Sequence, residues 1–132
     1  MKIFAKITSS LNQQEIVLQT SDASKSIALP IKPSGLGSAV NGGELLLLAL
    51  ATCYCNDIYR EAAKTNIPLS AVKVQCEGTF GAEGEPGNNF SYRVEVTSDA
   101  PSEVIEELIR TTDRVAEIHN TLRAGRNVTL IR

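Results

Sequence analysis

The sequence predicts an α+β fold, and three observations carry this prediction. A long helix-compatible stretch, NGGELLLLALATCYCNDIYREAAKT, runs from Asn41 to Thr65. After it, residues 70–80 and 90–96 alternate between apolar and polar side chains, which is typical of an antiparallel hairpin with one solvated face. The expected order of elements is βββ–α–ββ–αα–β, with like elements grouped rather than interleaved. A chain of 132 residues fits one domain of this kind, covering residues 1–132.

The N-terminal part of the chain predicts three short extended segments joined by polar turns. The strands are expected at residues 2–7 (KIFAKI), 15–20 (EIVLQT) and 26–31 (SIALPI). Turns or loops are expected at residues 9–14, 21–25 and 32–43. The first two strands should pair as a hairpin. The third should lie at a sheet edge, because Pro30 has no backbone N–H to donate to a ladder.

The stretch from Glu44 to Thr65 is predicted to form one central, buried helix. From Leu45 to Cys53 only Thr52 is polar, so this half should be buried on every face rather than along one stripe. At 1.5 Å per residue, ~22 residues span ~33 Å, about the width of a small domain. The apolar run is too short to cross a bilayer, which takes ~20 apolar residues. The remaining chain is small for covering such a helix, so we expect a partner subunit, in a homodimer.

Two helices and a closing strand are expected after the hairpin. Ser102 is the expected N-cap of the first helix. Its apolar stripe would be Val104, Ile105, Leu108 and Ile109. The second, shorter helix would turn Val115, Ile118 and Leu122 inward. Gly125 is expected to cap its C-terminus, and residues 127–132 are expected to form the last strand.

Composition narrows the class of partner. The formal net charge is -2, with both signs interspersed and no basic run, which argues against nucleic acid and against an anionic membrane as partners. No apolar leader follows Met1, so we expect no signal peptide. Three cysteines, an odd number, predict thiols in a reducing cytoplasmic compartment rather than a disulfide framework. No phosphate-loop spacing occurs, and we expect no cofactor.

The strongest candidate for chemistry is Thr52-Cys53-Tyr54-Cys55, in the middle of the predicted helix. Apolar neighbours should raise the pKa of Cys53, and a reactive thiolate there would need a cation or a base from elsewhere. From the residues alone, a buried cysteine acting as a small hydrophobe is favoured. Cys53 and Cys55 point about 200° apart on a helix, a direction that disulfide geometry does not tolerate.

Three further residues leave alternatives open. Glu44 could orient a cation near Cys53, or it could simply suit the positive end of the helix dipole. His119 could approach the thiol as a base, although a partly exposed histidine without a ligand role is favoured. Cys76 is expected in the strand core. A zinc site from Cys53, Cys55 and His119 lacks ligand spacing, so we expect no metal.

Several segments resemble the OsmC/Ohr family, the osmotically induced and organic-hydroperoxide-resistance proteins. The resemblance is carried by residues 42–53 (GGELLLLALATC), 62–69 (AAKTNIPL) and 72–74 (VKV). Residues 115–122 (VAEIHNTL) are similar to the family's second cysteine-bearing helix. The resemblance extends from about residue 39 to the C-terminus. It implies an OsmC-like fold, with antiparallel sheets wrapped around a long central helix in an intertwined homodimer and active sites at the interface.

The resemblance also implies an activity. Active members reduce organic hydroperoxides: one cysteine attacks the peroxide, and a second resolves the sulfenic acid as a disulfide. Cys53 matches the attacking cysteine by position. Ala116 and Glu117 stand in place of the second cysteine and its proline, and Gly43 stands where one branch has a carboxylate that orients an arginine. No arginine precedes Arg60, so the family's thiolate-activating arginine has no counterpart in the N-terminal region.

Two functions of different class therefore remain open. One is a thiol-dependent hydroperoxide reductase that uses Cys53. Its resolving thiol would be Cys55 after local rearrangement, a thiol of the partner chain, or an external thiol. The other is a non-catalytic OsmC-like dimer that binds a small apolar ligand or serves in assembly.

Overall fold

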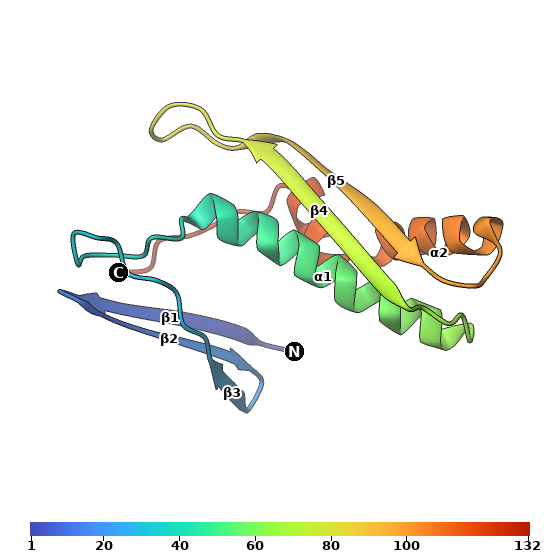
Figure 1. Cartoon of the computed structure of the whole chain (residues 1–132). Helices are drawn as coiled ribbons and strands as arrows, with labels where there is room; N and C mark the ends of the chain where they lie inside the picture. Colours follow the sequence, from blue (N-terminus) through green and yellow to red (C-terminus); the bar gives the residue numbers. More distant parts are fainter. The chain divides into compact units, whose positions relative to one another are not determined.

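The computed structural model describes residues 1–132 and separates into two compact units, Met1–Leu45 and Leu46–Arg132. Its elements follow the predicted order up to the last strand (Figure 1). The single domain expected over residues 1–132 stays a prediction.

The first unit contains a three-stranded antiparallel sheet in the order β1-β2-β3. β1 (Ile3–Ser10) and β2 (Gln13–Thr20) form the predicted hairpin. The predicted turn at residues 9–14 was too wide, because pairing continues to Ser10 opposite Gln13. Asn12 takes a positive φ of 57°, a conformation that asparagine tolerates, and this lets two residues reverse the chain.

The third strand lies at different residues from those predicted. β3 is Ala23–Ser26, so residues 23–25 of the expected loop pair with β2, and the strand expected at residues 26–31 does not form. Ser21, with φ 51°, turns the chain directly after β2 and brings Ala23 opposite Thr20. Of the residues expected in that strand, Ser26 pairs with Val17 as the end of β3, and Ile31 forms an isolated bridge to Ser38.

The long helix α1 spans Gly42–Lys64, 23 residues, close to the predicted bounds. β4 (Ala71–Thr79) and β5 (Asn88–Thr97) form the predicted antiparallel hairpin, with one irregularity between Glu77 and Thr79. The predicted alternation is confirmed along β4, where Val72, Val74 and Cys76 are half-buried and the residues between them are exposed.

The core of the second unit lies between α1, the hairpin and α2 (Ser102–Val115). Tyr54, Ile58 and Ala62 lie at helical spacing on one face of α1 and are buried with Leu108 of α2 and with Ala116. Valines of the hairpin's inner face pack against this cluster, as Figure 1 shows for the hairpin running along α1. Burial of a side chain such as Ile58 stabilises the fold by about 1.5–3 kcal/mol.

The first half of α1 is not buried on every face within the chain. Of the run Leu45–Cys53 only Leu50 is buried, while Leu48 is 59% exposed. A central position of the helix and a homodimer that covers it therefore stay predictions.

The start of α2 and the C-terminal segment also differ from expectation. Pro101, not Ser102, is the N-cap of α2: its carbonyl accepts from the backbone N–H groups of Val104 and Ile105. Residues 127–132 form no strand, although their sequence alternates, because no neighbouring strand pairs with them.

None of the three helices combines the length and the hydropathy needed to cross a membrane.

The helix α3 (Glu117–Arg123) presents a different face from the one predicted. His119 is only 5% exposed, whereas Leu122 is 37% exposed. The reason is the extended backbone of Ala116, which interrupts the helix between α2 and α3. The residues of α3 therefore do not continue the helical periodicity of α2. The C-cap is Ala124, one residue before the expected Gly125, which follows it with φ 57°.

Candidate functional site

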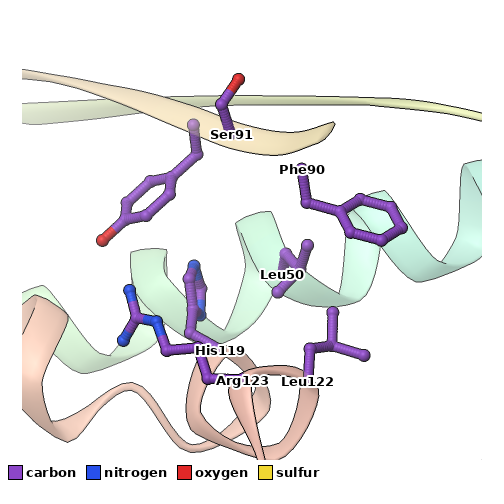
Figure 2. Close-up of a pocket in the computed structure, with 7 residues that line it drawn as sticks. Leu50, Phe90, Ser91, His119, Leu122 and Arg123 are labelled. Atoms are coloured by element: carbon purple, nitrogen blue, oxygen red, sulfur yellow. The ribbon is translucent and has the colours of Figure 1, made fainter. Parts of the chain in front are cut away.

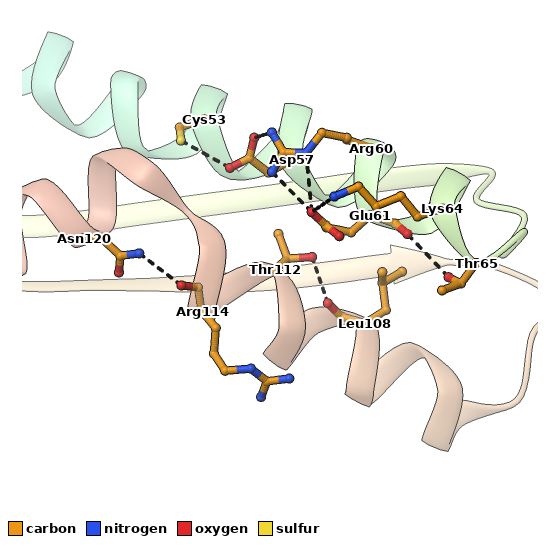
Figure 3. A network of polar contacts seen from close by, with 10 residues as sticks. All are labelled: Cys53, Asp57, Arg60, Glu61, Lys64, Thr65, Leu108, Thr112, Arg114 and Asn120. Atoms are coloured by element: carbon orange, nitrogen blue, oxygen red, sulfur yellow. Dashed lines mark hydrogen bonds and ion pairs between the residues drawn. The ribbon is translucent and has the colours of Figure 1, made fainter.

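The thiol of Cys53 is held by a carboxylate one turn later on α1 (Figure 3). Its Sγ donates to Oδ2 of Asp57 at 3.6 Å, the i,i+4 spacing at which helical side chains meet. Asp57 is 6% exposed, and its other oxygen, Oδ1, accepts from Nη1 of Arg60 at 2.9 Å. Thiol, carboxylate and guanidinium thus form a chain along one helix.

The cation of this chain comes from the second half of the same helix. Arg60 also contacts Glu61 at 3.3 Å, and Lys64 contacts Glu61 at 2.9 Å. Asp57 raises the pKa of Arg60, so the guanidinium stays charged. The side chain of Arg60 is 44% exposed, so solvent screening keeps the contribution of its ion pair to stability small. Its main effect is to compensate the charge of the buried Asp57.

Backbone N–H groups at the start of α3 also influence the thiol of Cys53, which lies on α1. The backbone N–H groups of Ile118 and Glu117 act on the Cys53 thiol and lower its pKa. Burial is the largest influence and raises the pKa, and the adjacent Asp57 carboxylate raises it further, so the net pKa lies above the ordinary thiol value. The direction agrees with the effect expected from apolar neighbours. Cys53 is therefore mainly protonated at neutral pH.

The other two cysteines have separate surroundings. Cys55 is half-buried and lines a small cavity with Thr52, Asn56 and Val74. Cys76 is half-buried on β4, and burial raises its pKa. All three thiols are free. The structure thus brings neither Cys55 nor Cys76 into hydrogen-bond contact with Cys53.

Glu44 forms a capping box at the start of α1. Its backbone N–H donates to Oδ1 of Asn41 at 2.8 Å, and its Oε1 accepts from the backbone N–H of Asn41 at 3.1 Å. This occupies the carboxylate locally and favours the helix-end role over the cation-orienting role. The signal, Asn-x-x-Glu ahead of an apolar run, is present in the sequence.

His119 is buried, contrary to the expectation of partial exposure. Its ring packs edge-on against Tyr92, with centroids 4.6 Å apart, and lies 6.0 Å from the ring of Tyr54. Neither ring nitrogen has a hydrogen-bond partner, so His119 makes no bond to Cys53. Burial, followed by the nearby Arg123, lowers the pKa of His119. The imidazole is consequently neutral at pH 7.

Comparison with known proteins assigns the chain to a family. The family model described as OsmC-like protein matches residues 35–131, most of the chain. This chain belongs to the OsmC-like family. The resemblance found in the sequence is therefore confirmed. No curated protein sequence matches the chain significantly.

Solved structures of OsmC-like proteins share the fold. An OsmC-like protein from Mycoplasma pneumoniae has a TM-score of 0.64 at 19% identity, covering 98% of each chain. An organic hydroperoxide resistance protein from Legionella pneumophila has a TM-score of 0.61 at 21% identity, covering 95% of this chain and 91% of that one. A putative one from Vibrio cholerae has a TM-score of 0.60 at 18% identity, covering 95% and 86%.

Within the OsmC-like fold, the position matched to the second cysteine is occupied by a buried alanine. Ala116 is 0% exposed and joins α2 to α3, immediately before the two residues whose amides face Cys53. Ala116 thus precedes in sequence the two residues that act on the Cys53 thiol, and it carries no sulfur of its own. Asp57 is the residue that sequence reasoning missed. Its signal was an acidic residue four positions after a helical cysteine.

Proposed function

We propose that this OsmC-like protein is a thiol-dependent reductase of organic hydroperoxides, with Cys53 as its nucleophile. The observation that carries the proposal is the hydrogen bond from Cys53 to Asp57, with the backbone N–H groups of Glu117 and Ile118 also at the sulfur. Family membership supports it, since the solved relatives from Legionella and Vibrio are described as hydroperoxide resistance proteins.

The Asp57 carboxylate takes the thiol proton as the Cys53 sulfur attacks the distal oxygen of the peroxide. The S–O bond forms while the O–O bond breaks, and the proton passes from Asp57 to the departing alkoxide to give an alcohol. Cys53 is oxidised to sulfenic acid, and the peroxide is reduced. The amides of Glu117 and Ile118 stabilise the negative charge on sulfur.

An external thiol completes the cycle. One thiol condenses with the sulfenic acid, releasing water and forming a mixed disulfide, and a second thiol attacks this disulfide to restore Cys53. Ala116 provides no internal resolving sulfur, and Cys55 faces Val74 and Thr52 rather than Asp57. The enzyme should therefore work as a one-cysteine peroxidase.

The raised pKa of Cys53 gives this reaction a distinctive pH dependence. Little thiolate is present at neutral pH, so the rate of peroxide reduction should rise steadily as pH increases toward the pKa of Cys53. A peroxidase with a preformed thiolate would show a flat profile over the same range.

The test is incubation with cumene hydroperoxide, with and without dithiothreitol, followed by mass analysis of the peptide that contains Cys53. Alcohol formation that requires dithiothreitol, together with sulfinic and sulfonic Cys53 when dithiothreitol is absent, supports the proposal. Cys53→Ser should abolish both signals, and Cys76→Ser is the matched control that should keep them. A Cys53–Cys55 disulfide as the main product would contradict the one-cysteine cycle.

Two observations, on Cys53 and on Ala116, favour a second function that is not catalytic. Cys53 is held protonated by burial, and the fully buried Ala116 offers no second sulfur. Both features suit a non-catalytic OsmC-like dimer that binds a small apolar ligand or serves in assembly. No oxidation of Cys53 under excess peroxide would favour this function over the reductase.

A further inference from the structure

A cavity of about 280 Å³ lies between α1, β5 and α3, within the second unit (Figure 2). Its apolar wall is formed by Leu50, Phe90 and Leu122, and its polar wall by Tyr92, His119 and Arg123. Cys53 is not among the lining residues. Small-molecule sites commonly combine a mainly apolar cavity with a few converging polar groups, as here.

His119 is the feature of this cavity that packing alone does not explain. It is 95% buried, as its 5% exposure shows, and neither Nδ1 nor Nε2 has a hydrogen-bond partner. A buried polar group without a partner costs free energy, and such groups in native proteins are few. Its ring contributes to the cavity wall beside Leu50 and Arg123 (Figure 2). A bound molecule with a polar head would supply the missing partner.

Arg123 is held in place and still has donors to spare. Its Nη1 donates to the Asp113 carbonyl at 3.2 Å and to Oδ1 of Asn120 at 3.0 Å, and its Nη2 donates to Oδ1 of Asp113 at 2.7 Å. A guanidinium has five N–H donors, so Nε and one N–H of Nη2 remain. Tyr92 also donates to Asp113, so that carboxylate is already well supplied with donors.

We propose that this cavity binds an aryl or short alkyl carboxylate. The apolar body would lie against Leu50, Phe90 and Leu122, and the carboxylate would accept hydrogen bonds from His119 and Arg123. Cavities of about 150 Å³ admit benzene, so the larger volume has room for roughly a bicyclic aromatic body. A guanidinium fork matches a carboxylate in shape and charge, whereas it repels an amine.

The binding should be coupled to a proton. Arg123 disfavours the imidazolium form of His119, and Asp113 and Asp57 favour it. Tyr54 and Tyr92, which pack against the ring, are uncharged at neutral pH because burial raises the pKa of each. A carboxylate placed beside the ring adds a further negative charge and favours protonation. Affinity for the carboxylate should therefore increase as pH falls.

The experiment compares three probes of equal apolar body by calorimetry on the full chain: 2-naphthoate, 2-naphthol and 2-naphthylmethylamine. We expect 2-naphthoate to bind at least roughly tenfold more tightly than the other two, the size of one charge-assisted hydrogen bond. Its affinity should rise between about pH 7.5 and about pH 5.5, where the probe stays ionised. The proposal would be overturned if 2-naphthol bound as tightly as 2-naphthoate with no dependence on pH, or if no probe bound.

Variants locate the site. His119→Gln should remove the pH dependence, and Arg123→Gln should remove the preference for the carboxylate. Arg114→Gln, an exposed arginine outside the cavity, is the matched control. Leu122→Trp should fill the cavity and abolish binding without touching the polar wall, which keeps the test decisive if Arg123→Gln fails to fold. Binding unchanged in Leu122→Trp and in His119→Gln would place the probe elsewhere and overturn the assignment.

This site is independent of the proposed reductase. Cys53→Ser removes the proposed nucleophile but no residue of the cavity, so the variant should bind 2-naphthoate with unchanged affinity. The binding experiment therefore tests the cavity independently of the peroxide assay.

Discussion

Nη1 of Arg60 lies 2.9 Å from Oδ1 of Asp57, and the other oxygen of the same carboxylate accepts the thiol hydrogen of Cys53. All three residues lie on α1, at spacings of four and three residues. The helix therefore provides both an anion next to the thiol and the cation that compensates it. This differs from the arrangement that the family resemblance implies, in which the cation precedes the helix.

Asp57→Asn should lower the pKa of Cys53, because it removes the negative charge that raises it. In a Cys55→Ser/Cys76→Ser background, Cys53 is the only thiol, and its alkylation rate by iodoacetamide can be followed against pH. We expect the profile to shift toward lower pH in Asp57→Asn. At neutral pH the same substitution should slow peroxide reduction, because the loss of the proposed proton acceptor outweighs the larger thiolate fraction.

Arg60→Gln should shift the alkylation profile the other way, because the Asp57 charge is no longer compensated. Glu61→Gln is the control: Glu61 pairs with Arg60 and Lys64 but does not contact the thiol. An unchanged profile in Asp57→Asn would mean that the carboxylate does not influence Cys53.

His119 should make the protein sensitive to mild acid. Its folded pKa lies below the ordinary value of 6.5, mainly because of burial. Above that value the imidazole is neutral in both states, and its contribution to stability is complete. As pH falls below 6.5, the unfolded chain binds the proton first, so stability decreases until the pH reaches the folded pKa.

Urea unfolding at about pH 7.5 and about pH 5 measures this effect. The wild type should lose more stability between the two values than His119→Phe, which keeps a ring beside Tyr92 but cannot titrate. The pKa of Asp113 is lowered from 3.8, so that carboxylate titrates below this window. Equal losses in the two proteins would contradict the assignment to His119.

Leu48 should lie in a homodimer interface, a proposal that rests on the exposed face of α1. Leu48 is 59% exposed and Tyr59 44% exposed, and at ~100° per residue both lie on one face of α1, roughly 110° around the helix from the buried Tyr54 and Ile58. Sedimentation at micromolar concentration should show one species of twice the 14.2 kDa chain mass. Leu48→Glu should convert it to the monomer, while Lys64→Glu at the helix end should not. A wild-type monomer would remove the proposal.

The capping box of α1 should contribute measurably to stability. Asn41→Ala removes the side-chain acceptor of the Glu44 backbone N–H, a change that costs about 0.5–2 kcal/mol at helix N-caps. Denaturant unfolding should show a loss of this size, with Asn41→Ser restoring most of it. Glu44→Ala should also destabilise the protein while leaving the alkylation profile of Cys53 unchanged. A shift of that profile would revive the cation-orienting role of Glu44.

The sequence by itself determined the elements whose cause is local. The apolar run before Cys53 and the capping residues predict a helix, and residues 70–80 alternate because one face of the hairpin packs on the core while the other is solvated. The family was also readable from the sequence, since it rests on the contiguous segment at residues 42–53. Even the capping box was present as a pattern, although its carboxylate was given two alternative roles.

Tertiary structure decided the features that depend on partners distant in sequence. The extended backbone of Ala116 reset the phase of α3, which buried His119 and exposed Leu122. The amides of Glu117 and Ile118 reach Cys53 only because α3 packs against α1. Residues 127–132 alternate like a strand but find no neighbour to pair with. Periodicity fixes which residues can share a face, whereas burial, pairing and thiol environment depend on which elements the folded chain brings together.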